Sequence, residues 1–223
     1  MSKENYFLDN PEINSYMKEK LPILVNESDR GAVLLGMSQV DNELQKLLKN
    51  IAPTDMTNKE KNWIEKATLA SKLNIAYTCR LLPRNIFESI NKLRKIRNAV
   101  AHNVETFNLK NYDILLNEIF ELLGEGANTF IHNTSLTYMI ENSISQIMSI
   151  KHPENQDKCI IEDRTSALNY IAEHKEVQDK IDEPMLKMKL AIGVLLISGI
   201  IIYERGKSLK VLLDDKVISS IKV

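Results

Sequence analysis

One short stretch of this chain combines residue types that can act together on a phosphodiester bond. It reads Arg97-Asn98-Ala99-Val100-Ala101-His102. Successive residues of a helix are about 100° apart, so Asn98 and His102 share one face and the long side chain of Arg97 can reach it. A histidine can move protons near neutral pH, an arginine can stabilise charge on a pentavalent phosphorus, and an asparagine can orient either group. The stretch is therefore a candidate site for metal-independent cleavage of RNA, with the substrate's own 2′-OH as nucleophile.

The same three residues also suit structural roles. His102 stands where a helix would end, and a cation there interacts favourably with the negative end of the helix dipole. Arg97 can pair with an acidic residue of another helix, and Asn98 can cap a neighbouring loop. The spacing alone leaves the catalytic and the structural interpretation open.

Positive charge is concentrated around this stretch. The whole chain of 223 residues has a formal net charge of −1, yet residues 59–110 contain eleven Lys or Arg against four Glu. This segment therefore carries +7 and the rest of the chain −8, and Arg94 and Lys95 lie directly beside Arg97. A basic segment on an acidic chain is typical of a local polyanion site, and solvated basic helix faces would give the same tally.

Other catalytic and metal-binding patterns are missing from the sequence. Gly124-Glu125-Gly126 lacks the Gly, Lys and Ser/Thr that complete a phosphate-binding loop. There is no CxxC or HExxH motif, and the remaining candidate ligands lack a spacing that would bring them together on one element: His132, His152, Cys159 and His174. We therefore expect no metal site and no cofactor.

Composition favours a helical, intracellular protein. The chain has only 7 Gly and 6 Pro, fewer than the many turns of a β-sandwich consume. Its two cysteines, Cys79 and Cys159, rule out a disulfide scaffold and suit a reducing cytosol. The first 20 residues contain no apolar run typical of a signal peptide, so we expect a cytoplasmic location.

Helical periodicity predicts the elements that position the site. From Met37 to Ile51 apolar residues recur three and four apart, which predicts a helix that begins near Asp29. Further helices are predicted over about 58–82, 84–102, 109–123, 127–150, 160–181 and 185–205. Residues 1–25 read as a polar lead with Pro11 and Pro22 as breakers, 151–157 as a polar loop, and 208–223 as a short strand pair or a docking segment. The fold class is thus all-α, with a helical core over 26–123 and a helical extension over 124–223.

The most apolar segment of the chain is Leu190–Tyr203. It spans 14 residues between Lys189 and Glu204, whereas a helix that crosses a membrane needs roughly 20 apolar residues. We therefore expect a buried helix that completes the core or a dimer interface, and no membrane contact.

The sequence resembles known families in two nested ways. Arg97-Asn98-x-x-x-His102 on the third helix of a predicted bundle resembles the signature of the HEPN superfamily, many members of which are metal-independent RNases of toxin, CRISPR and antiphage systems. More closely, three blocks over residues 27–123 are similar to the mannitol operon repressor-like family. These blocks are Glu27–Ala32 with Val40–Leu44, Ser71–Tyr77, and Leu93–Asn103. The chain departs from that family where Ala99-Val100 replaces an acidic-aromatic pair, and where residues 124–182 are longer than its usual link.

The resemblance implies an all-α HEPN-type bundle and a polar site. That site would combine Arg97, Asn98 and His102 with three residues near the start of the first core helix: Glu27, Asp29 and Arg30. In the HEPN superfamily two protomers usually face each other, which implies a homodimer. Two functions follow as hypotheses. The first is an RNA-directed protein of a toxin or defence system that cleaves single-stranded RNA without a metal and is paired with a protein partner such as an antitoxin. The second is a non-catalytic transcriptional regulator that acts through protein partners.

Overall fold

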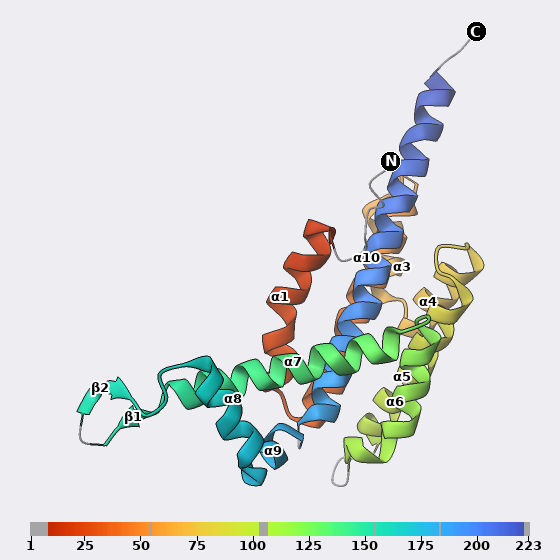
Figure 1. Cartoon of the computed structure of the whole chain (residues 1–223). Coiled ribbons are helices and arrows are strands. Elements are labelled where there is room, and N and C mark those ends of the chain that lie inside the picture. The colour runs from red at the N-terminus through yellow and green to blue at the C-terminus, as the bar shows by residue number, and fades with distance from the viewer. Residues whose placement is uncertain (1–8, 54, 103–106, 154, 183, 221–223) are drawn as a thin grey trace.

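Helices at the predicted apolar periodicity build almost all of this molecule. The structure is a computed structural model, and it describes residues 9–53, 55–102, 107–153, 155–182 and 184–220. Figure 1 shows the helices gathered into a bundle, with a small hairpin at one end and the C-terminal helix projecting at the other. The fold is an all-α helical bundle, so the predicted fold class is confirmed.

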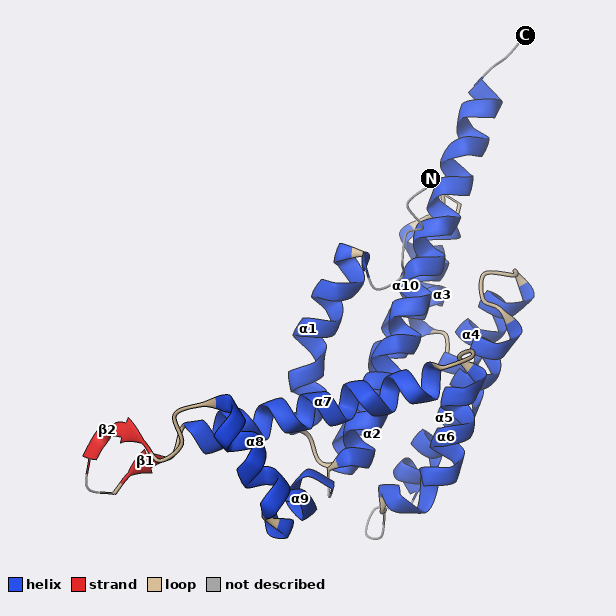
Figure 2. Ribbon diagram, viewed as in Figure 1, coloured by secondary structure: helices blue, strands red, loops and turns tan. Residues whose placement is uncertain are grey.

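The elements follow one another along the chain with short connections. The helices are α1 (Pro11–Asn26), α2 (Asp29–Ile51), α3 (Asn58–Lys66), α4 (Leu69–Thr78), α5 (Arg84–His102), the 3₁₀ turn η2 (Leu109–Tyr112), α6 (Asp113–Leu122), α7 (Ala127–Met148), α8 (Arg164–Glu173), α9 (Lys175–Asp182) and α10 (Met185–Ser220). The strands are β1 (Lys151–His152) and β2 (Asn155–Cys159), which pair antiparallel. Figure 2 shows this hairpin as the strand-containing part of the described chain.

Helix α2 is the centre of the bundle. Its predicted apolar stripe is buried, with Met37, Val40 and Leu44 at most 3% exposed. The helix begins where the Ser28 hydroxyl accepts a hydrogen bond from the Gly31 N–H at 3.0 Å, a standard N-cap. Helices α1, α4, α5 and α10 all pack against α2. Every predicted site residue is therefore positioned, directly or through one neighbour, by this helix.

Helix α10 completes the core. It packs most extensively along α2 and also contacts α1 and α7. Its axis passes so close to α6 that a Cβ built on Gly193 would lie 2.1 Å from a ring carbon of Phe120, so a side chain at this position would clash. Among the described residues, this apolar helix is long enough to cross a membrane, but 72% of its most apolar window is buried inside the molecule. The prediction of a buried core helix is confirmed.

Two predicted boundaries differ at the ends of the chain. Residues 11–26 form helix α1 and not an irregular lead, because Pro11 occupies the first helical turn, where its missing N–H costs nothing, behind the N-cap Asn10. Pro22 lies inside the same helix without ending it. At the other end, α10 continues as one helix to Ser220, so the predicted strand pair is wrong. Residues 221–223 lie outside the described part of the chain.

Two long helices predicted from periodicity are each divided. The segment 58–82 breaks after Lys66, because Ala67 is extended and the Thr68 hydroxyl accepts a hydrogen bond from the Ser71 N–H, which starts α4. The segment 160–181 breaks at His174, which is also extended. The spacing of apolar residues does not reveal an interruption of the helix at a single residue.

The predicted break after the fourth core helix is confirmed. Gly124 and Gly126 both adopt left-handed backbone conformations, with φ of 133° and 79°, which glycine adopts at little cost. They separate α6 from α7. The largest cluster of buried hydrophobic residues nevertheless continues across this break, from Ala32 to Ile201.

Candidate functional site

Helix α5 presents an apolar face to the core and a polar face outward. The predicted stripe is buried to at least 98% at every position: Ile86, Ile90, Leu93, Ile96 and Val100. The predicted catalytic residues Arg97, Asn98 and His102 are all exposed. The N–H of the Arg97 guanidinium donates a 3.4 Å hydrogen bond to the Asn98 side-chain oxygen, so these two polar groups lie together.

A cavity of about 730 Å³ lies where α2, α4 and α5 meet, and it is open to solvent. Helix α5 contributes Arg94, Arg97 and Asn98 to its wall. The other lining residues come from α2 and from the start of α4: Leu34, Met37, Ser38, Asp41, Ala67, Thr68, Leu69 and Ala70. Two of the three predicted catalytic residues therefore border one cavity.

The cavity is electropositive because its arginines are not neutralised. In the part of the chain that the structure describes, neither Arg94 nor Arg97 forms an ion pair with a carboxylate. Arg94 is half-buried and has no carboxylate partner among the described residues. Such an arrangement favours binding of an external anion.

The N-terminus of α4 adds to this positive potential. Thr68, Leu69 and Ala70 line the cavity, and they are the cap and the first two residues of that helix. The first N–H groups of a helix lack intrahelical acceptors and carry the positive end of the helix dipole. The two arginines and the helix end thus act on the same space.

An ion pair between the buried Lys72 and the partly exposed Asp41 holds α2 and α4 together beneath the cavity. Lys72 is 1% exposed, and its ammonium group donates hydrogen bonds to Asp41 Oδ2 at 3.0 Å and to Gln45 Oε1 at 3.1 Å. Because Asp41 also lines the cavity, Lys72 compensates the one carboxylate among the lining residues. The positive charge of the arginines is therefore not cancelled from this side.

The remaining predicted site residues lie elsewhere. His102 is the last residue of α5 and is not among the residues that line the cavity, and Lys95 is exposed outside it. Glu27, Asp29 and Arg30 lie at the turn between α1 and α2, also outside the lining set. The Glu27 carbonyl accepts a 2.9 Å hydrogen bond from the Lys187 ammonium group, which joins this turn to α10.

Sequence reasoning missed Asp41, Lys72 and Ser38 as parts of this region. The sequence contained a signal for Lys72. This lysine interrupts the apolar face of a helix, because it is next to the buried Leu73 and four residues before the buried Ala76. A charged residue at such a position needs a partner. Asp41 and Lys72 also fall within the first two of the three blocks quoted for the resemblance, and a hydrogen bond between their side chains joins these two blocks.

Among the described residues, no group of three His, Cys, Asp or Glu side chains is placed to hold a metal ion. Comparison with protein-family models, with the sequences of curated proteins and with solved structures finds no match to this chain.

Proposed function

We propose that this protein is an RNA-directed protein of HEPN type that cleaves single-stranded RNA without a metal ion. One observation carries the proposal: Arg97, Asn98 and His102 are exposed on one helix whose arginines border an open, electropositive cavity. Unpaired cations are what a phosphate backbone requires. Single-stranded RNA is the favoured substrate because its bases are accessible and its 2′-OH is free to attack.

The proposed reaction needs a proton acceptor, a proton donor and a stabilised phosphorane. His102 takes the proton of the 2′-OH, and the 2′-oxygen attacks the adjacent phosphorus. The new 2′-O–P bond forms as the P–O5′ bond breaks, and the leaving 5′-oxygen receives a proton from an imidazolium. Arg97 stabilises the negative charge of the phosphorane, and Asn98 holds the Arg97 guanidinium in place. The products are a 2′,3′-cyclic phosphate and a 5′-hydroxyl.

The proposal includes a homodimer. A single helix offers one such histidine, whereas the reaction uses one base and one acid, and two copies facing each other supply both. The setting would be cytoplasmic, as part of a toxin or defence pair in which a protein partner such as an antitoxin restrains the activity.

The test uses the full chain and single-stranded RNA in EDTA. The wild type is expected to produce 2′,3′-cyclic phosphate ends, and His102→Ala to lower the rate by about 10²–10⁴-fold. His132→Ala is the matched control, because His132 is also an exposed histidine on a helix, α7, outside the site. Cleavage that needs magnesium, or a His102→Ala variant as fast as wild type, would overturn the proposal.

A non-catalytic regulator acting through protein partners is the second candidate. It is favoured by the position of His102 outside the lining of the cavity, because phosphate binding at Arg94 and Arg97 then does not require a proton donor. RNA that is bound but left intact by the wild type in the same assay would support this function over the first.

A further inference from the structure

The cavity between α2, α4 and α5 has two chemically different walls. Leu34, Met37 and Leu69 form an apolar wall from α2 and α4. Arg94 and Arg97 form a cationic wall on α5. A site for inorganic phosphate alone needs no apolar wall of this kind, and a site for an apolar ligand needs no arginines. The ligand that matches both walls has an apolar part joined to an anion, as a nucleotide has in its base and phosphate.

We propose that this cavity holds one unpaired nucleotide of the RNA substrate, with its base against the apolar wall and its phosphate at Arg94 and Arg97. This inference rests on the proposed function and names the part of the RNA that enters the fold. It also explains why two of the three α5 residues border the cavity while His102 stands outside. The nucleotide is held inside, and the adjacent phosphodiester lies at the rim.

The dimensions and polar groups of the cavity fit this ligand. Its volume of about 730 Å³ lies within the range of about 300–1,000 Å³ that is usual for small-molecule sites. Unpaired bases bind proteins by packing their faces on side chains and by forming hydrogen bonds at their edges. Ser38 lies on the wall, and its hydroxyl can donate to or accept from such an edge.

Filling the cavity tests the inference without touching the arginines or His102. Ser38 is exposed on α2 and lines the cavity, so Ser38→Phe adds a ring to the cavity and leaves the core unchanged. Asn42→Phe is the matched control, because Asn42 is exposed one turn further along the same helix and is not among the lining residues. Nucleoside monophosphates are titrated into the full chain, wild type and both variants, by calorimetry or ligand-observed NMR.

The wild type and Asn42→Phe are expected to bind a nucleoside monophosphate, and Ser38→Phe to bind it at least tenfold more weakly. The monophosphate should also inhibit RNA cleavage by the wild type. Parallel titrations use inorganic phosphate and the matching nucleoside, each of which should bind more weakly than the monophosphate. Inorganic phosphate binding as tightly as the monophosphate would overturn the base site.

The same experiment separates this inference from the proposed function. A wild type that binds no nucleotide, or a Ser38→Phe variant that binds it normally, overturns the nucleotide site even if RNA is cleaved. The opposite result is also informative. If the wild type binds the nucleotide, Ser38→Phe abolishes this binding and no RNA is cleaved, the cavity is the nucleotide site and the catalytic function is wrong.

Discussion

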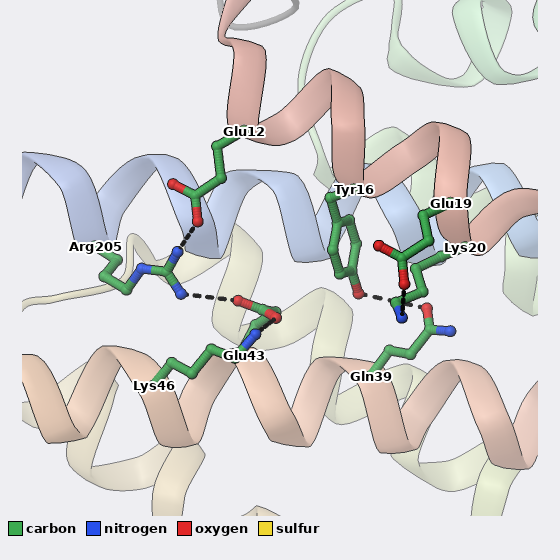
Figure 3. Close-up of polar contacts among 8 residues, drawn as sticks. All are labelled: Glu12, Tyr16, Glu19, Lys20, Gln39, Glu43, Lys46 and Arg205. Carbon is green, nitrogen blue, oxygen red and sulfur yellow. Dashed lines mark hydrogen bonds and ion pairs between the residues drawn. The ribbon is translucent and has the colours of Figure 1, made fainter.

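Two arginines near helix α2 have opposite surroundings. The side chain of Arg205 in α10 is only 13% exposed. It forms ion pairs with Glu43 of α2 and Glu12 of α1, as Figure 3 shows. Arg94 of α5 borders the open cavity on another face of α2 and has no carboxylate partner among the described residues. Glu43 and the cavity-lining Asp41 are two residues apart, about 200° around the helix. One helix therefore supports a closed and an open electrostatic environment.

The difference separates charge that holds the fold from charge that is available to a ligand. Glu43 is 2% exposed and accepts from both Arg205, at 3.0 Å, and Lys46, at 2.6 Å, so its desolvation is compensated within the protein. Within the described part of the chain, the two cavity arginines have no carboxylate that compensates them in this way. Substitutions in the first region should change stability, and substitutions in the second should change binding and activity.

Among the substitutions that test this comparison, Arg97→Ala has the largest expected effect. Under the proposed function it lowers RNA cleavage by about 10²–10³-fold, the usual cost of removing one group that stabilises the transition state. Its free energy of unfolding should stay within about 0.5 kcal/mol of wild type, because Arg97 is exposed and makes only a 3.4 Å contact with Asn98 among the described residues. Cleavage rates and urea unfolding are measured on the same preparations.

The control for this prediction is a substitution of Leu93, four residues before Arg97 on the same helix. Leu93→Ala, on the buried face of the same helix, should lower the free energy of unfolding by roughly 2–5 kcal/mol. Arg97→Ala with a comparable loss of stability would show that Arg97 is structural, and the contrast between the two regions would fail.

Arg205→Ala should act through stability. It removes a partner from the buried Glu43, and breaking a buried ion pair typically costs about 3–5 kcal/mol. The remaining contact with Lys46 places the expected loss at the lower end of this range. Arg84→Ala is the matched control. Arg84 pairs with Glu88 on the exposed surface of α5, where water screens the pair, so its loss should lower the free energy of unfolding much less. Equal losses for the two variants would contradict the prediction.

The sequence predicted the helices of the bundle better than their ends. Apolar spacing identified the core faces of α2 and α5 because burial of one helix face imposes that period. It could not locate the division at Thr68, which depends on one side-chain cap, or the continuation of α10 to Ser220. It also interpreted residues 1–25 as a polar lead interrupted by Pro11 and Pro22, because a proline at a helix start and a proline that ends a helix look alike in one sequence.

The site was predictable along one helix and not between helices. The exposure of Arg97, Asn98 and His102 follows from the position of the apolar stripe on α5. The cavity also requires Ser38 of α2 and Thr68 of α4 to meet that helix, and this is a tertiary arrangement that spacing does not encode. For the same reason the sequence could not show that Arg94 lines the cavity while Lys95, its neighbour, does not.

Tyr16 provides a pH test of the closed region. Burial raises the pKa of Tyr16 to about 12, and the nearby Glu43 adds to the effect. In the unfolded chain the phenol ionises near pH 10, so the folded state binds this proton more tightly. Its contribution to stability is complete below about pH 10 and is lost as the pH rises toward 12.

Between pH 9 and pH 12, the free energy of unfolding should therefore fall less for Tyr16→Phe than for wild type. At neutral pH the variant should be slightly less stable, because it lacks the hydrogen bond to Gln39. Urea unfolding across this range measures the difference. If the free energy of unfolding falls equally with pH in the two proteins, the Tyr16 hydroxyl is not buried between α1 and α2.

Arg94→Gln gives the smallest expected effect and the one most specific to the open region. Arg94 has no ion-pair partner among the described residues, so its loss should leave the free energy of unfolding within about 0.5 kcal/mol of wild type. Each phosphate of a single strand that a protein neutralises adds about 0.7 to the slope of log affinity against log salt. Loss of one such contact should therefore reduce the slope of log affinity against log salt by about 0.7 for RNA binding, with weaker binding at low salt.

Lys95→Gln is the comparison, because Lys95 is exposed outside the cavity lining and should change the slope less. A slope that falls equally in both variants would mean that RNA follows the general basic surface of α5, and the cavity would have no special part in binding.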